Sequence, residues 1–340
     1  NTLMRGYVLS RPIRTQPTAG IIFLILVAHI FIDVRSLESL FGRVTMLNNF
    51  SIVVANLVKE IFSICLLFAI TAFLRTATVA TVLVHSTSMN KDIKTIVVYP
   101  SFKKKSNTEK YPVIYLLHGA YGYYHSWLEI KPDLPEIADD MGVIFVTPDA
   151  LNSWYFDSPK LKDFRYETFM IKELLPYIDS HYATIAHREG RAITGLSMGG
   201  HGALFLAMRH KELFGACGSM SGGVDIRPFP LNWNLPDVLG EMASNKAEWD
   251  SLTVVNQISR IKNGDLAIIF DCGESDFFLE VNKSLHQRLL GAGIDHDFCT
   301  RPGAHNSQYW NNSLDYQLVF FKKYFERHHA LASYVKFTEK

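Results

Sequence analysis

The chain has 340 residues, of which 48% are hydrophobic and 20% are charged, and this composition excludes a disordered or fibrous protein. Its 34 lysines and arginines nearly balance 33 aspartates and glutamates, so the net charge of +1 gives no reason to expect a nucleic-acid partner. The length is enough for one large domain or two small ones. The first eighty residues carry seven basic and three acidic side chains, which sets them apart from the rest of the chain.

Residues 1–78 are expected to form a separate apolar segment. Its two apolar runs, Ile21–Ile32 and Ile61–Leu74, are shorter than the ~20 residues that a membrane-spanning helix needs. The second run follows Lys59 and leads into small residues ending at Ala80, a pattern typical of a secretory signal. We therefore expect an exported protein, periplasmic or secreted, with no stable membrane association after the signal is removed. The alternatives to a signal are a membrane anchor and helices of a folded core, and without a signal the protein would be cytoplasmic. Met46 is a candidate start of translation, in which case the residues before it are an upstream over-extension.

Four cysteines do not define a disulfide framework in a chain of this length. Cys272 and Cys299 each end an apolar run, so they could lie on neighbouring strands and form a bridge in an exported protein. Two buried free thiols are the expected state. No Cys/His cluster has the spacing of zinc ligands, so we expect no metal.

Residues 79–330 alternate between short apolar runs and longer helical patterns, with 331–340 as a C-terminal tail. The expected strands are Val79–His85, Ile93–Tyr99, Val113–His118, Val143–Thr147, Arg191–Leu196, Phe214–Met220, Leu266–Cys272 and Asp295–Thr300. The expected helices are Leu134–Met141, Thr168–Ser180, Gly199–Lys211, Leu279–Leu290 and Trp310–His328. This alternation predicts one α/β domain with a mostly parallel sheet covered on both faces. Only Gly222–Ser259, rich in Pro, Asn and Trp, interrupts it, and this segment is predicted to be an insertion over one end of the sheet.

A candidate nucleophile stands at the end of the fifth predicted strand. The sequence Gly195-Leu196-Ser197-Met198-Gly199 is a Gly-x-Ser-x-Gly motif immediately before a predicted helix. The sharp strand-to-helix turn needs small residues two positions before and two after the serine. Ser197 is therefore predicted to be raised above the sheet beside a helix N-terminus, which favours developing negative charge.

A serine hydroxyl becomes a good nucleophile only when a base takes its proton. His305 lies in a Gly/Pro loop after the last predicted strand and is the expected base. The preceding strand runs into three acidic residues, of which Asp276 is preferred as the orienting carboxylate because it lies past Gly273 in the loop; Glu274 and Asp271 are the alternatives. The order Ser…Asp…His is the one expected of α/β-hydrolases.

A tetrahedral intermediate needs two N–H donors for its oxyanion. One is expected from Met198, the residue after the nucleophile. The other is expected from the loop His118-Gly119-Ala120-Tyr121-Gly122, where Ala120 is the first candidate and Tyr121 the second.

At these residues the chain resembles the putative-esterase branch of the α/β-hydrolases, which contains esterase D, S-formylglutathione hydrolases, feruloyl, acetylxylan and tributyrin esterases, and mycolyltransferases. The resemblance covers residues 80–328 and rests on six motifs: Leu116–Gly122, Pro148–Asp149, Asn152–Tyr155, Gly195–Ala203, Asp271–Phe278 and Pro302–Asn306. It implies the α/β-hydrolase fold and ester hydrolysis through an acyl-enzyme on Ser197, with His305 as base and then acid and Asp276 holding its tautomer. It implies no metal and no organic cofactor.

The expected substrate is a short-chain acyl, acetyl or feruloyl ester, including esters on polysaccharides. A thioesterase of the S-formylglutathione type is the first alternative, and an acyltransferase is a further one. Tyr121, Tyr155 and Trp310 are the candidates to border the substrate pocket, with core packing as the other interpretation of Tyr155 and Trp310. Phe277 and Phe278 are expected to anchor a helix in the core.

Overall fold

The computed structural model describes residues 56–63, 77–101 and 110–331. The chain divides into two units, Asn1–Leu74 and Arg75–Lys340. In the first unit, residues 56–63 are helical, and the rest of the predicted export signal lies outside the described residues. Within the described ranges, no helix combines the length and the apolar character that crossing a membrane requires.

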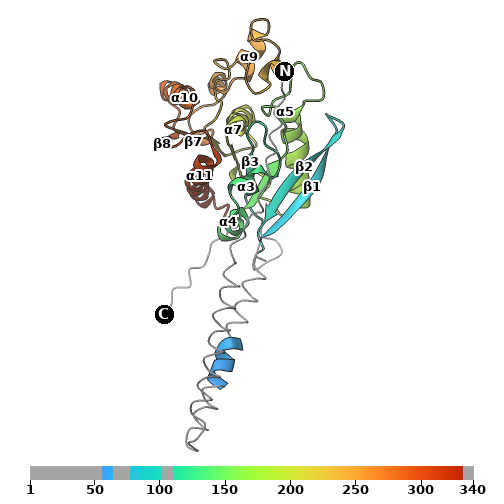
Figure 1. Cartoon of the computed structure of the whole chain (residues 1–340), viewed down its shortest axis with the longest axis vertical. Helices are drawn as coiled ribbons and strands as arrows, with labels where there is room; N and C mark the ends of the chain where they lie inside the picture. The colour runs from blue at the N-terminus through green and yellow to red at the C-terminus, as the bar shows by residue number, and fades with distance from the viewer. Residues whose placement is uncertain (1–55, 64–76, 102–109, 332–340) are drawn as a thin grey trace, which may run out of the picture. The chain divides into compact units, whose positions relative to one another are not determined.

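The second unit contains an eight-stranded sheet in the order β1-β2-β4-β3-β5-β6-β7-β8. Figure 1 shows β1 and β2 on one side of β3, and β7 and β8 on the other. The strands are β1 (Thr78–Ser86), β2 (Lys91–Tyr99), β3 (Val113–Leu117), β4 (Ile144–Pro148), β5 (Arg191–Gly195), β6 (Ala216–Met220), β7 (Ala267–Gly273) and β8 (Asp297–Arg301). Pairing is antiparallel between β1 and β2 and between β2 and β4, and parallel from β4 to β8. The predicted mostly parallel sheet of an α/β-hydrolase is confirmed.

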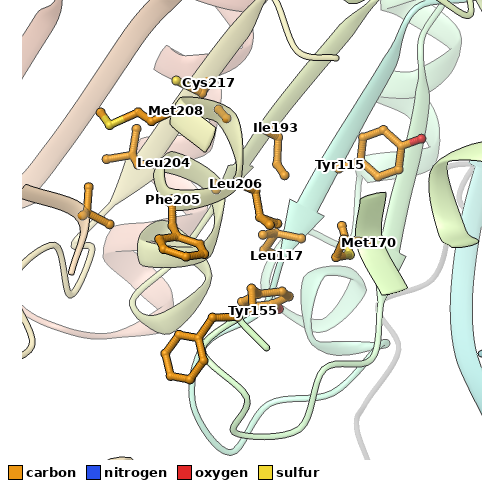
Figure 2. Packing of buried hydrophobic residues seen from close by; sticks show 14 of the residues in the cluster. Tyr115, Leu117, Tyr155, Met170, Ile193, Leu204, Phe205, Leu206, Met208 and Cys217 are labelled. Carbon is orange, nitrogen blue, oxygen red and sulfur yellow. The ribbon is translucent and has the colours of Figure 1, made fainter. Parts of the chain in front are cut away.

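Both faces of the central strands are covered, as their unbroken apolar runs predict. In β3, Tyr115 and Leu117 belong to one buried cluster, and Ile114 and Leu116 belong to a second cluster on the other face. The first cluster includes residues of α7, and Figure 2 shows them packed over the strands. The second cluster includes residues of α3, α4 and α11.

The helices of this unit are α3 (Ser126–Ile130), α4 (Leu134–Met141), α5 (Tyr166–Thr168), α6 (Leu175–His181), α7 (Met198–Arg209), α8 (Leu235–Leu239), α9 (Lys246–Leu252), α10 (Leu279–Gly291) and α11 (Ser307–Arg327). The single helix expected over Thr168–Ser180 is divided by a π-helical turn, Phe169–Leu174. Pro176 follows this turn in the first turn of α6. Because proline has no N–H to donate to the preceding turn, the regular α-helical ladder is interrupted there.

The predicted insertion lies between β6 and β7 and contains α8, α9 and two 3₁₀ turns, Val254–Asn256 and Ile258–Arg260. Trp249 of α9 is fully buried, and its indole N–H donates to the Gly240 carbonyl at 3.0 Å. The insertion is therefore packed onto the domain around its own tryptophan.

The cysteines of the described chain are free, as expected. Cys272 is buried as predicted, whereas Cys299 is exposed on the edge strand β8. Cys272 and Cys299 do lie on neighbouring strands, but Asp271 is the residue that pairs with Cys299. Cys272 is one position out of register, and successive side chains of a strand point to opposite faces. The two sulfur atoms therefore lie on different faces of the sheet.

Candidate active site

Ser197 occupies the turn between β5 and α7, with φ 55° and ψ −116°. Its backbone N–H donates to the Met220 carbonyl at 2.9 Å, which ties this strained turn to β6. A Cβ atom at Gly199 would lie 2.2 Å from the Leu117 carbonyl oxygen, and one at Gly195 would lie 2.5 Å from the Gly199 backbone. Both glycines are thus required by close backbone approach.

The three predicted catalytic residues lie in one hydrogen-bonded row. His305 Nε2 is 2.9 Å from Ser197 Oγ, and His305 Nδ1 is 2.8 Å from Asp276 Oδ2. Because the Asp276 carboxylate only accepts, this row places the imidazole proton on Nδ1 and leaves Nε2 free to accept the serine proton. Asp276 Oδ1 accepts a second bond from the Phe278 N–H at 2.8 Å, and its side chain is fully buried. The carboxylate is therefore fixed in direction before substrate arrives.

The two alternative carboxylates lie elsewhere. Glu274 is exposed. Asp271 is buried in β7 and faces α11, where it accepts hydrogen bonds from the side chains of Tyr309, Ser313 and Gln317. Burial raises the pKa of the Asp271 carboxyl above its usual value. Asp271 supports the helix that follows the His305 loop, and it does not contact the imidazole.

The loop after β3 passes close to the nucleophile. A Cβ atom at Gly119 would lie 3.3 Å from Ser197 Cβ and 2.6 Å from Leu196 Cδ1. Only glycine therefore lets the backbone of residues 119 and 120 reach the reacting centre.

The N–H groups of this loop are not equivalent. Tyr121 donates its N–H to Asn152 Oδ1 at 2.7 Å, so this group is already engaged. In the part of the chain that the structure describes, neither the Ala120 N–H nor the Met198 N–H donates to a protein acceptor. The geometry thus favours Ala120 over Tyr121 as the partner of Met198 in an oxyanion hole.

A pocket of about 470 Å³ opens over Ser197 and His305, with aromatic walls formed by Tyr121, Trp233, Phe277 and Trp310. Trp310 packs edge-on against His305 at a centroid distance of 5.0 Å. Tyr121 and Trp310 line the pocket, as we expected from the sequence. Phe277 is not the core residue that we expected: it is 51% exposed and stacks on Trp233 at the pocket wall.

Tyr155 does not border the pocket, and the structure bears out the other interpretation, core packing. It is fully buried in the hydrophobic cluster that Figure 2 shows. Its hydroxyl donates to the His118 carbonyl at 3.1 Å. Its backbone has φ 62°, and its ring occupies the space that a side chain at residue 202 would need. The left-handed turn directs the ring into the core beneath the oxyanion loop.

Several residues of the pocket lining were not identified from the sequence, among them Trp233 and Glu129. Trp233 comes from the insertion, whose tryptophan content was the available signal, and Glu129 comes from α3, a helix that the sequence pattern did not indicate. Glu129 accepts a hydrogen bond from the Tyr123 hydroxyl. Among the described residues that line the pocket, it is accompanied by no lysine or arginine. Over the same described part of the chain, no group of His, Cys, Asp and Glu is arranged to hold a metal.

The chain was compared with known proteins. Residues 86–321 match the family model described as "Putative esterase". An acetyl esterase of Caldicellulosiruptor saccharolyticus is 26% identical over 248 residues, which cover 68% of this chain and 92% of that enzyme. An esterase of Mycobacterium tuberculosis is 28% identical over 229 residues, which cover 59% of this chain and 50% of that esterase.

The fold has solved counterparts. A ferulic acid esterase superposes with a TM-score of 0.64 at 31% identity, covering 74% of this chain and 99% of that one. An S-formylglutathione hydrolase from Agrobacterium tumefaciens superposes with a TM-score of 0.62 at 20% identity over 73% of this chain and 96% of that one. The second likeness concerns the fold alone.

Proposed function

The chain belongs to the putative esterase family of the α/β-hydrolases and is a carboxylic ester hydrolase, and we propose that Ser197, His305 and Asp276 perform its reaction through an acyl-enzyme. The observation that carries this proposal is the continuous hydrogen-bonded row from Asp276 through His305 to Ser197. This arrangement is the one that converts a serine hydroxyl into a nucleophile.

In the first half of the reaction, Ser197 Oγ attacks the ester carbonyl carbon while its proton passes to His305 Nε2. The carbonyl oxygen becomes an oxyanion that accepts hydrogen bonds from the Ala120 and Met198 N–H groups. The tetrahedral intermediate then breaks its bond to the alcohol oxygen, which leaves with the proton from His305. The acyl group remains on Ser197.

In the second half, water takes the place of the alcohol. His305 Nε2 accepts a proton from the water as its oxygen attacks the acyl carbon, and then returns that proton to Ser197 Oγ as the acid leaves. Asp276 stays ionised throughout and stabilises the imidazolium that forms twice in each cycle.

For the substrate, we propose a short acyl, acetyl or hydroxycinnamoyl ester of an uncharged alcohol, such as a sugar hydroxyl of a polysaccharide. The pocket volume of about 470 Å³ is that of a small-molecule site, and its aromatic walls suit a planar acyl group or a sugar ring. The names of two similar proteins, an acetyl esterase and a ferulic acid esterase, point in the same direction.

A thioesterase acting on S-formylglutathione is the second candidate, because S-formylglutathione hydrolases are among the similar proteins. Glutathione carries two carboxylates, whereas the pocket wall carries the acidic Glu129 and, among its described residues, no lysine or arginine. Repulsion between like charges therefore favours the oxygen ester of a neutral alcohol.

The test is hydrolysis of a substrate panel by the wild type and by Ser197→Ala. The panel contains p-nitrophenyl acetate and butyrate, methyl ferulate, acetylated xylan and S-formylglutathione. We expect turnover of the oxygen esters by the wild type only, together with labelling of the wild-type serine by a fluorophosphonate. Unchanged hydrolysis by Ser197→Ala would refute the catalytic assignment, and a preference for the thioester would refute the substrate assignment.

We also propose that the protein is exported, on the strength of the apolar run Ile61–Leu74 and the small residues that follow it. Fractionation of expressing cells and N-terminal sequencing of the recovered protein test this. Cleavage near residue 80 in an exported fraction is expected, and an uncleaved cytoplasmic protein would contradict it.

A further inference from the structure

The turn after β4 has an unusual backbone. Leu151, Trp154 and Tyr155 all have positive φ angles, of 48°, 56° and 62°. Side chains other than glycine rarely adopt this region, and it persists only where surrounding contacts hold it. The turn itself contacts both the oxyanion loop and the insertion, and these contacts hold its backbone.

One set of contacts joins this turn to the oxyanion loop. Asn152 Oδ1 accepts the Tyr121 N–H at 2.7 Å, and the Tyr155 hydroxyl donates to the His118 carbonyl at 3.1 Å. The Ala150 N–H donates to His118 Nε2 at 3.0 Å, and His118 Nδ1 donates in turn to the Gly119 carbonyl at 2.8 Å. Burial lowers the pKa of His118, which keeps its Nε2 available as an acceptor.

A second set joins the same turn to the insertion. Asn152 Nδ2 donates to Asn234 Oδ1 at 3.0 Å, and the Trp154 indole N–H lies 3.4 Å from the Trp233 carbonyl oxygen. The side-chain amide of Asn152 therefore has both its ends engaged. Because the Tyr121 N–H can only donate, the amide oxygen must face the oxyanion loop and the amide nitrogen must face the insertion.

We propose that Asn152 is a positioning residue for ester hydrolysis, which fixes the oxyanion loop through its hydrogen bond to the Tyr121 N–H. With the Tyr121 N–H held by Asn152, the neighbouring Ala120 N–H is the group left to meet the oxyanion. The inference rests on the proposed acyl-enzyme mechanism, and it adds a residue that touches neither the substrate nor the triad.

The size of the effect separates this role from a structural one. Asn152 is only half-buried, so losing one of its hydrogen bonds exchanges it for a bond to water at a modest cost in stability. Removing an oxyanion donor costs on the order of 10²–10³ in turnover. A displaced donor should lower turnover by less than a missing donor does. It should still lower turnover by more than the small loss of stability can explain.

The experiment compares Asn152→Ala with Asn234→Ala in the full chain. Asn152→Ala loses both contacts, whereas Asn234→Ala removes the insertion side and keeps the bond to Tyr121. We measure kcat and KM on p-nitrophenyl acetate, the inhibition constant of a trifluoromethyl ketone and the thermal unfolding midpoint. For Asn152→Ala we expect kcat and inhibitor affinity to fall together by roughly 10-fold or more, with KM within about 3-fold of the wild type. For Asn234→Ala we expect kcat on this small ester to be retained.

Wild-type kcat and inhibitor affinity in Asn152→Ala would overturn the proposal, as would an equal loss of kcat in Asn234→Ala. If Asn152→Ala does not fold, Asn152→Ser, which keeps a polar side chain without the amide, is measured in its place against the same criteria. Ser197→Ala separates the two levels of inference. An active Ser197→Ala refutes the mechanism itself, whereas an inactive one beside a fully active Asn152 variant refutes only the positioning role.

Discussion

The buried Asp271 carboxylate in β7 accepts a hydrogen bond at 2.9 Å from the Tyr309 hydroxyl in the first turns of α11. His305 lies in the loop just before α11, so this bond holds the helix that follows the catalytic loop. Five residues after Asp271, Asp276 binds the His305 imidazole itself. Two carboxylates from one strand and its loop therefore support one histidine, the second directly and the first through a helix.

These two carboxylates should respond differently to the same substitution. Asp276→Asn removes the acceptor that selects the His305 tautomer, so kcat on p-nitrophenyl butyrate should fall by about 10⁴-fold. Asp271→Asn replaces an acceptor of three buried donors, so it should lower the free energy of unfolding by about 1–3 kcal/mol and leave kcat within about 10-fold. Urea unfolding and steady-state kinetics on both variants check this. A folded Asp271→Asn as inactive as Asp276→Asn would contradict the separation.

The elbow glycine makes a second prediction. Gly199→Ala would place a Cβ atom 2.2 Å from the Leu117 carbonyl oxygen, and a backbone atom cannot move away without disturbing the central strand β3. We expect an insoluble or inactive protein. Gly291→Ala is the matched control, because a Cβ atom there would meet nothing within 4 Å. The measurement is soluble yield and fluorophosphonate labelling; a labelled, soluble Gly199→Ala would show that the elbow tolerates a side chain.

Much of this arrangement was predictable because its signals are local. The central strands are apolar on both faces, which identifies them without knowledge of their neighbours. Ser197 stands in a motif whose spacing is dictated by one turn, and the order of Ser197, Asp276 and His305 follows from where parallel strands end. The roles of such residues can be predicted from a few neighbouring positions in the sequence.

Other residues depend on contacts between distant segments. Tyr155 and Phe277 are both aromatic residues in loops near the carboxyl ends of strands, yet one is fully buried and the other is 51% exposed. The left-handed backbone at Tyr155 turns its ring into the core. Phe277 instead stacks at the pocket wall on Trp233, which the insertion supplies. Glu129 reaches the pocket from the five-residue helix α3, which is too short to leave a periodic pattern.

His201 gives the third prediction, on stability against pH. Its side chain is fully buried against the rings of Trp154 and Phe205, and burial lowers its pKa to about 4. The unfolded chain protonates this imidazole near its ordinary value of about 6.5, so between about 6.5 and 4 the unfolded state binds more protons. The free energy of unfolding should therefore fall as pH falls through this window, by up to about 3 kcal/mol from this group alone.

His201→Asn tests that assignment, because an asparagine amide can still donate to the Gly223 carbonyl that His201 Nδ1 contacts at 3.1 Å. Denaturant unfolding at several pH values from 7 to 4.5 should show a shallower loss of stability in this variant than in the wild type. The buried His118, whose pKa burial also lowers, contributes to the slope that remains. Identical slopes in the two proteins would contradict the role of His201, whatever their absolute stabilities.

Glu129 gives the fourth prediction, on the choice between ester and thioester. Its carboxylate lies at the wall of the pocket, so it should repel the carboxylates of S-formylglutathione and leave a neutral ester unaffected. Glu129→Gln should raise kcat/KM for S-formylglutathione by about 3- to 10-fold at low salt, mainly through KM, and leave p-nitrophenyl acetate unchanged. Because Glu129 is exposed, the gain should shrink as ionic strength rises.

The matched control for this change is Glu136→Gln in α4, which removes the same charge from an exposed helical position outside the pocket. If both variants gained equally on the thioester, the effect would belong to the net charge of the protein and not to the pocket. If Glu129→Gln gained nothing while the wild type already preferred the thioester, the carboxylate would not select against anionic leaving groups. A gain confined to Glu129→Gln and abolished by salt would instead assign the discrimination to this one side chain.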